Sequence, residues 1–164
     1  MPAGTSPQPA LARVLRWLAR RDRSEAEIRS RLAEWGVDSD ESATVIARLR
    51  GRGLIDDAAL AERICDWHAR HDPLGPLGLR LKLRQRGIPD ELSEAALQPW
   101  FDWECQRELA ERVLVKREAA LVGLSPATRW RRQGDALRRR GFEPDLIRTL
   151  TEPLLRAAGD DDEQ

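Results

Sequence analysis

Apolar residues recur along this chain at the spacing of amphipathic α-helices. In residues 10–21, Leu11, Val14, Leu15 and Leu18 stand at positions i, i+3, i+4 and i+7, which places them in one stripe along a helix. Similar stripes follow along the chain, separated by short segments that contain glycine, proline or aspartate. The pattern therefore predicts a mainly helical protein.

A short segment that ends one helix and begins the next occurs three times. It reads RLAEWGVDS in residues 31–39, KLRQRGIPD in residues 82–90 and ALRRRGFEPD in residues 136–145. In each copy a leucine stands four positions before a glycine, and an apolar residue follows the glycine. Glycine accepts the left-handed conformation that ends many helices, and the apolar residue can then pack back on the last turn. The next helix begins with a residue suited to a helix N-terminus, namely Asp38, Pro89 and Pro144.

The first helix of each unit repeats as well. Residues 60–71 align with residues 10–21 at an offset of 50, so that Arg63 falls on Arg13 and Trp67 on Trp17. The third unit follows at an offset of 49, with Arg112 on Arg63. A period near 50 with three helices per unit indicates a helical repeat protein, whose units bury their apolar faces against their neighbours. We therefore predict an all-α fold of three tandem three-helix repeats, resembling helix-turn-helix units, in an elongated and curved array.

The repeats and the composition of the ends predict the organisation of the chain. The second repeat contains the stretch LGLRLKLR, which alternates strictly and alone would indicate a strand. We expect a helix there because its counterparts are helical and because Leu79 and Leu83 stand at i, i+4. The last helix is expected from Pro144 to Thr151, limited by Pro153. The predicted segments are a disordered tail at 1–9, repeats at 10–53, 54–102 and 103–155, and an acidic disordered tail at 156–164.

Composition narrows the class of protein. Charged residues make up 34% of the chain, and no stretch of about 18 consecutive apolar residues predicts a membrane span. The two cysteines cannot form a disulfide framework, and the first ten residues lack the pattern of a signal peptide. These features favour a soluble, cytoplasmic protein.

The net charge is zero, but the charges are segregated along the chain. Residues 77–87 contain four bases and no acid, residues 126–141 contain six arginines and one acid, and residues 90–111 contain seven acids and one base. Such segregation favours a polyanion or an acidic protein surface as the partner of the basic faces. The candidate contact residues are Arg80, Lys82, Arg84, Arg86, Arg129, Arg131, Arg132, Arg138, Arg139 and Arg140.

Residues that could carry catalysis or bind a metal are few. Cys65, His68 and His71 lie at i, i+3, i+6 and could form a metal site with Cys105. We favour a structural role, because Cys65 aligns with core leucines of the other two repeats and buried cysteine is common. No activated nucleophile pair and no phosphate-binding glycine loop occurs. We therefore expect neither an enzyme nor a cofactor.

Six tryptophans could stack on nucleic-acid bases. Trp17 and Trp67 occupy equivalent positions of two repeats, which favours a role in packing between helices. Trp130 is flanked by Arg129 and Arg131 and is the best candidate for an exposed aromatic contact residue.

Residues 53–92, GLIDDAALAERICDWHARHDPLGPLGLRLKLRQRGIPDEL, resemble the signature of the RecX regulatory proteins. The likeness lies in the GLIDD joint, in the helix that ends with KLRQRGI, and in the acidic helix start that follows. Residues 23–38, RSEAEIRSRLAEWGVD, are similar to the first unit of that family. The chain departs from the family pattern at residues 59–61, where an aromatic residue is usual, and at Leu74, where tyrosine is usual.

The resemblance implies a non-enzymatic modulator of the RecA recombinase. Members of this family bind the RecA filament on DNA along its helical groove and curb strand exchange, ATP hydrolysis and co-protease activity, which affects recombination, DNA repair and the SOS response. On this view the ten bases named above, with Trp130, contact acidic filament surface or DNA phosphates, and a monomer is expected. A stand-alone DNA-binding protein, with ALRRRG as a recognition helix, and a scaffold for another protein are the alternatives.

Overall fold

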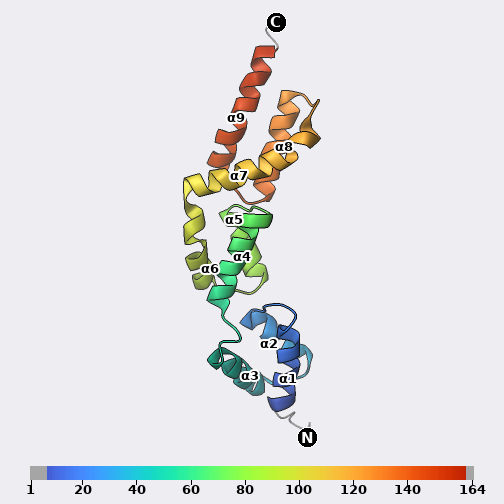
Figure 1. The fold of residues 1–164 in the computed structure, drawn as a ribbon, viewed down its shortest axis with the longest axis vertical. Helices are drawn as coiled ribbons and strands as arrows, with labels where there is room; N and C mark the ends of the chain where they lie inside the picture. The colour runs from blue at the N-terminus through green and yellow to red at the C-terminus, as the bar shows by residue number, and fades with distance from the viewer. Residues whose placement is uncertain (1–6, 162–164) are drawn as a thin grey trace. The chain divides into compact units, whose positions relative to one another are not determined.

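The computed structural model of the protein describes residues 7–161, in which every regular element is a helix (Figure 1). No strand occurs within this range. The elements, in chain order, are α1 (Pro7–Leu18), α2 (Glu25–Glu34), α3 (Ser39–Gly51), α4 (Asp57–His71), α5 (Pro76–Gln85), α6 (Asp90–Leu97), the 3₁₀ helix η1 (Gln98–Phe101), α7 (Trp103–Glu118), the 3₁₀ helix η2 (Ala119–Leu121), α8 (Pro126–Arg139) and α9 (Pro144–Asp161).

The predicted all-α fold of three-helix repeats is confirmed, with α1–α3, α4–α6 and α7–α9 as the repeats. The alternating stretch is helix α5, as expected. Leu79 and Leu83 are buried, whereas Leu77 and Leu81 are about half exposed. The leucines that a strand would place on one face are therefore divided between two sides of a helix.

The three predicted glycine stops adopt the left-handed conformation, with φ of +76° at Gly36, +67° at Gly87 and +76° at Gly141. In each case the amide of the following residue donates to the carbonyl of the leucine four positions before the glycine, at 3.0, 3.1 and 3.3 Å respectively. This bond satisfies one of the carbonyls that a helix end leaves without a partner. The leucines that accept it, Leu32, Leu83 and Leu137, are fully buried.

Polar side chains begin several helices as the sequence indicates. Ser24 and Glu27 form the predicted capping box of α2, and Ser125 accepts a hydrogen bond from the amide of Thr128 at the start of α8. Asp56 accepts from the amide of Ala59 and thus caps α4.

Both ends of the chain are more helical than the sequence predicts. Helix α1 already begins at Pro7, because proline fits the first turn of a helix. Helix α9 continues through Pro153 to Asp161, so the predicted end of the helix near Thr151 is wrong. Thr151 is buried and Leu154 is partly buried, so packing on both sides of the proline offsets the lost backbone hydrogen bond. The other residues of the two predicted tails, 1–6 and 162–164, lie outside the described range.

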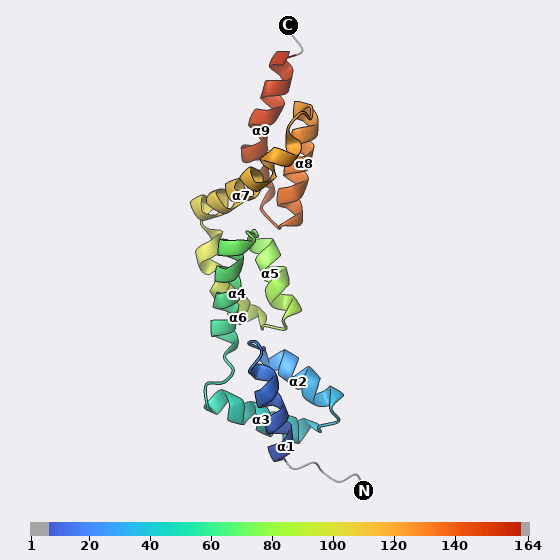
Figure 2. The same ribbon diagram turned by 45° about the vertical axis from the view of Figure 1, so that its right-hand side comes forward.

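The described residues pack as two compact units whose boundary cuts through the middle repeat. One unit comprises the chain up to Arg63 together with Leu83–Ser93, and its core joins α1, α2 and α3. The other comprises Ile64–Lys82 together with the chain from Glu94 onward. In this second unit α8 and α9 run side by side and α7 crosses them, as both views show (Figures 1 and 2).

The boundary falls within the middle repeat because α5 contributes one end to each unit. At its N-terminal end, the amides of Gly75 and Leu77 donate to the carbonyls of Arg140 and Gly141, at 3.0 and 3.2 Å. A Cβ atom on Gly78 would lie 2.2 Å from the Arg140 oxygen, so the two backbones meet without a side chain between them. We call this contact the α5–α8 joint.

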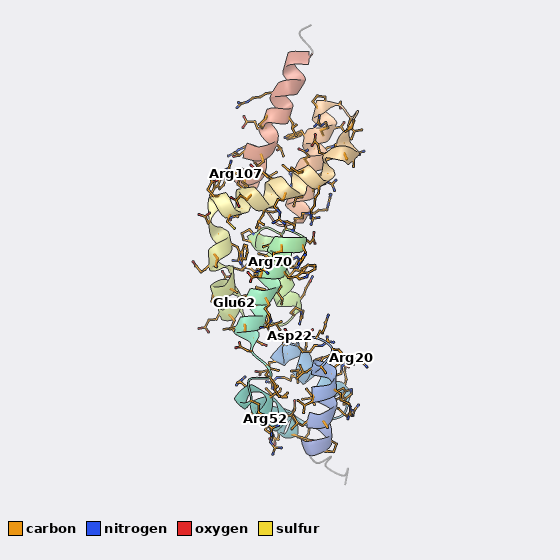
Figure 3. The ribbon with its side chains drawn as sticks, viewed as in Figure 1. Arg20, Asp22, Arg52, Glu62, Arg70 and Arg107 are labelled. Atoms are coloured by element: carbon orange, nitrogen blue, oxygen red, sulfur yellow. The ribbon has the colours of Figure 1, made fainter. Side chains whose placement is uncertain are left out.

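The C-terminal end of α5 makes a corresponding contact with the start of α2. The Ser24 hydroxyl donates to the Arg86 carbonyl, and the Arg86 guanidinium donates to the Asp22 carbonyl at 2.9 Å. Asp22, labelled in Figure 3, lies in the connection between α1 and α2. The Arg86 guanidinium also pairs with Glu27 at 3.0 Å. We call this contact the α2–α5 joint.

The α5–α8 joint predicts opposite effects for two glycine-to-alanine substitutions in the same unit. Gly78→Ala should lower the free energy of unfolding by about 1–3 kcal/mol, because its methyl group overlaps the backbone of α8. Gly134→Ala, in the interior of α8, should instead raise it by about 0.5–1 kcal/mol, because its methyl group meets only Ile147 Cγ2 at 3.7 Å. Urea unfolding followed by circular dichroism measures both; equal stability of the two variants would contradict this account of the joint.

Candidate anion-binding clefts

Half of the ten predicted contact bases are held in ion pairs within the protein. Arg80 pairs with Glu94, Arg86 with Glu27, Arg129 with Glu118, Arg138 with Asp135 and Arg140 with Asp72. Arg86, Arg129 and Arg140 are also partly buried. These arginines therefore contribute to structure as well as to surface charge.

The Arg80–Glu94 pair illustrates the geometry of the engaged bases. The Arg80 Nε and Nη2 atoms donate to the two carboxylate oxygens of Glu94, at 2.7 and 2.9 Å. The guanidinium holds the pKa of Glu94 below its ordinary value. Because the Arg80 and Glu94 side chains are 38% and 51% exposed, solvent screens the pair and its contribution to stability is small.

The other five predicted bases are exposed, and no ion pair to them occurs among residues 7–161. Their charge is available to a partner. They are Lys82 and Arg84 on α5, and Arg131, Arg132 and Arg139 on α8.

A cleft of about 380 Å³ lies beside the α5–α8 joint and collects bases from three helices. Lys82 comes from α5, Arg117 from α7, and Arg139 from the end of α8. Arg140 also lines it and is paired with Asp72 at 2.8 Å, so three cations face the cleft without an acid of their own. We call this cavity the α5–α8 cleft.

Arg117 is a part of this cleft that the sequence did not single out. Its Nε atom is buried and has no hydrogen-bond partner in the structure. Arg117 lies in the last turn of α7, outside the two basic segments at residues 77–87 and 126–141. A base in the last turn of a helix is usually explained by the helix dipole, so no signal marked this residue for binding.

A second cleft, of about 410 Å³, lies beside the α2–α5 joint. It is lined by Trp17, Arg23, Ala26, Glu27, Ser30, Arg31, Glu34, Arg84, Gln85, Arg86 and Gly87. We call this cavity the α2–α5 cleft. Its positive charge is partly neutralised by Glu27, which lies 3.8 Å from Arg23 and 3.0 Å from Arg86.

The electrostatics of the α2–α5 cleft centre on Glu27. Burial alone would raise the pKa of this carboxyl, but the Ser24 amide and the Arg86 guanidinium outweigh burial and hold the pKa below its ordinary value. The pKa of Arg23 is lowered by burial and then by the positive charge of Arg21. The carboxylate is therefore a fixed anion among several guanidinium groups.

The two clefts occupy equivalent places in the repeat. Ser24 directly precedes α2, and Gly75 directly precedes α5. Counting from these two residues, Gly78 stands where the first repeat has Glu27, and Lys82 stands where it has Arg31. Arg86 and Arg140 correspond in the same way, because each directly precedes a glycine stop. The α2–α5 cleft thus carries two carboxylates, Glu27 and Glu34, whereas the α5–α8 cleft has Gly78 in place of Glu27 and carries only Asp72, which is paired with Arg140. The α5–α8 cleft is therefore the better candidate for an external anion.

Trp130 does not join the bases of this cleft. It is 38% exposed and lines a separate groove of about 710 Å³ between α8 and α9. The floor of this groove includes Phe142 and Ile147, and Arg131 and Arg138 lie at its rim. Trp130 is thus exposed, as the sequence predicts, and it lines an apolar groove together with Arg131 and Arg138.

The packing role predicted for Trp67 needs correction. Trp67 is 53% exposed, whereas its counterpart Trp17 is partly buried against the core of the first repeat. Sequence equivalence suggested the same environment for both. The covering residues are not equivalent, however, because Arg23 and Arg31 stack on Trp17 at 4.1 and 5.1 Å.

The residues considered for a metal site are used in other ways. Cys65 is fully buried, and the His68 Nδ1 atom lies 3.1 Å from the Asp72 carbonyl oxygen. Within the part of the chain that the structure describes, no three histidine, cysteine or acidic side chains come together as metal ligands. In the same range no helix is both long and apolar enough to cross a membrane.

Family models match almost the whole of the described chain. The first, second and third three-helix domains of RecX match residues 10–49, 56–97 and 104–150. The chain belongs to the RecX family. This confirms the resemblance seen in the sequence and the plan of three helical domains in tandem.

Individual RecX proteins agree with this assignment. The regulatory protein RecX of Chlorobaculum tepidum is 35% identical over 146 residues, which cover 89% of this chain and 88% of the relative. That of Stenotrophomonas maltophilia is 32% identical and covers 88% and 86%. A crystal structure of regulatory protein RecX superposes with a TM-score of 0.78 at 27% identity, covering 90% of this chain and 73% of the other. RecX proteins are regulatory, and membership agrees with the expectation that this chain is not an enzyme.

The lowered pKa of Glu27 predicts a dependence of stability on pH. Since the folded-state pKa lies below the ordinary value of 4.5, the stabilising contribution is complete above pH 4.5 and is lost as the pH falls below it. Glu27→Gln should therefore reduce the loss of unfolding free energy between about pH 7 and about pH 3. Glu34→Gln, an exposed substitution on the same helix, serves as the control. Urea unfolding at several pH values measures the effect, and an unchanged pH profile for Glu27→Gln would contradict the role given to this carboxylate.

Proposed function

We propose that this protein regulates the RecA recombinase by binding the RecA filament on DNA and restraining its activity. The match of all three RecX domains along one chain carries this proposal. Restraint of strand exchange, ATP hydrolysis and co-protease activity would adjust recombination, DNA repair and the SOS response. The place of action is the cytoplasm, where the recombinase and its DNA are found.

The α5–α8 cleft supports the mode of binding. It presents Lys82, Arg117 and Arg139 without an acid of their own, which suits a chain of phosphates or an acidic protein surface. Arg80, Arg86 and Arg129 are better described as structural, because their guanidinium groups already hold carboxylates. Contact with phosphates would release counterions, so affinity should fall as the salt concentration rises.

The primary test is the rate of ATP hydrolysis by the cognate RecA on single-stranded DNA, titrated with this protein. The rate should fall when far less than one molecule per RecA monomer is present, because blocking a filament end affects many monomers. The measurement is made at a salt concentration where the protein alone does not coat the DNA. An unchanged rate together with tight binding to bare DNA would instead establish the alternative, a DNA-binding protein without a recombinase partner.

A pair of variants tests the contribution of the α5–α8 cleft. Lys82→Ala with Arg139→Ala removes two exposed cations without breaking an ion pair among residues 7–161. The concentration that halves ATP hydrolysis should rise by roughly two- to thirtyfold, the range for two exposed charge contacts.

The matched control for this experiment is Arg48→Ala with Arg52→Ala. These residues lie on and just after α3, are exposed, and line neither cleft, so the control makes the same change in net charge. It should inhibit like the wild-type protein. An equal loss in both double variants would show that total charge matters and that the cleft does not.

A further inference from the structure

Trp67 presents an aromatic ring to solvent beside charged groups. It lies one turn before the end of α4, and the His71 ring is tilted against it with ring centroids 5.3 Å apart. The His68 ring meets it edge-on at 4.9 Å. Arg70, labelled in Figure 3, lies on the same turn and is exposed. The two histidines thus support the indole from its own helix and leave half of its surface free.

Trp17, at the equivalent position of the first repeat, shows which groups can contact this tryptophan. Trp17 lines the α2–α5 cleft, and Arg23 and Arg31 place their flat guanidinium groups over its ring. In the second repeat Leu74 stands in place of Arg23 and is buried, and Lys82 stands in place of Arg31. No cation lies over Trp67 in the described part of the chain. The position that is covered by planar groups in one repeat is therefore open in the next.

The last turn of α4, which follows Trp67, is bound by cations of α7, and the residue after it lines the α5–α8 cleft. The Arg112 guanidinium donates to the carbonyls of Ala69 and Arg70 at 2.6 and 2.8 Å, and Lys116 Nζ lies 3.4 Å from the His71 carbonyl oxygen. Asp72, the residue directly after α4, lines the cleft together with Arg117 of α7. The exposed ring thus lies at the end of α4 that borders the group of unpaired cations.

We propose that Trp67 is a base-stacking residue for a single strand of DNA whose phosphates bind the α5–α8 cleft. This inference rests on the proposed function and specifies which part of a recombinase–DNA filament this face contacts. An aromatic ring beside a basic groove is the usual arrangement of proteins that bind single strands without reading their sequence. A duplex does not offer the face of a base, because its bases are stacked on one another, so the site prefers a single strand.

The test uses the full-length protein and fluorescein-labelled oligothymidylate of about 16 nucleotides, followed by fluorescence anisotropy at low salt. Trp67→Ala should weaken binding by roughly five- to 150-fold, the loss of one base–aromatic stack. Trp67→Phe keeps an aromatic ring and should retain most of the affinity. Trp103→Ala removes a tryptophan that is 41% exposed from the same unit and should bind like the wild-type protein.

An abasic strand of the same length separates stacking from phosphate contacts. The wild-type protein should bind it more weakly than oligothymidylate, whereas Trp67→Ala should bind both strands equally. The salt dependence of the binding constant provides a second comparison. The slope of its logarithm against the logarithm of the salt concentration should stay unchanged in Trp67→Ala, because an indole ring neutralises no phosphate. The slope should become shallower by about 0.7 in Arg139→Ala, because this arginine would neutralise one phosphate and release its counterion.

Two results would overturn the stacking proposal. One is unchanged oligothymidylate binding by Trp67→Ala, and the other is an equal loss on both strands, which would indicate a structural role for the ring. Failure to bind either strand would also overturn it. Because this assay contains no recombinase, these outcomes leave the ATP hydrolysis measurement to decide the proposed function independently.

Discussion

Contacts between the ends of helices hold the repeats of this protein together. A helix leaves amides without partners at its start and carbonyls without partners at its end, and these ends carry opposite partial charges. At the α5–α8 joint the amides of Gly75 and Leu77 bind the carbonyls that end α8. At the α2–α5 joint the Ser24 hydroxyl performs the corresponding task for the Arg86 carbonyl. The repeats are thus joined by polar groups that each helix would otherwise leave to water.

The joints also determine where charge collects. The residue before the second and the third glycine stop, Arg86 or Arg140, lies at a joint through its carbonyl and reaches an acid of the preceding repeat through its side chain. The clefts lie beside these arginines, so their position follows from the joints, while their net charge depends on single residues such as Glu27 or Gly78. Two equivalent clefts therefore differ in chemistry although they share a scaffold.

Local patterns predicted most of the fold. The glycine stops, the capping box of Ser24 and the helical nature of α5 all follow from interactions within a few residues. The candidate site was less predictable, because the partner of a base can lie far away in sequence: Glu27 is 59 residues from Arg86. The exposure of Trp67 could not be predicted for a related reason. The tryptophan of the first repeat is covered by Arg23, and the second repeat has Leu74 at that position. Pro153 lies within α9 because burial on both sides, which sequence alone does not reveal, outweighs its local effect.

The direction of the joints has a consequence for how such a protein can lengthen. The middle repeat offers hydrogen-bond donors at the start of α5 and an acceptor at its end, so it carries one half of each kind of joint. In the first repeat Trp35 stands where Arg86 and Arg140 stand in the others, and Arg13 covers its ring at 4.0 Å. A tandem duplication of the middle repeat would bring both halves with it, the amides of Gly75 and Leu77 as donors and the Arg86 carbonyl as acceptor. Gene duplication alone could therefore extend the array from within, while the first repeat stays at its terminus.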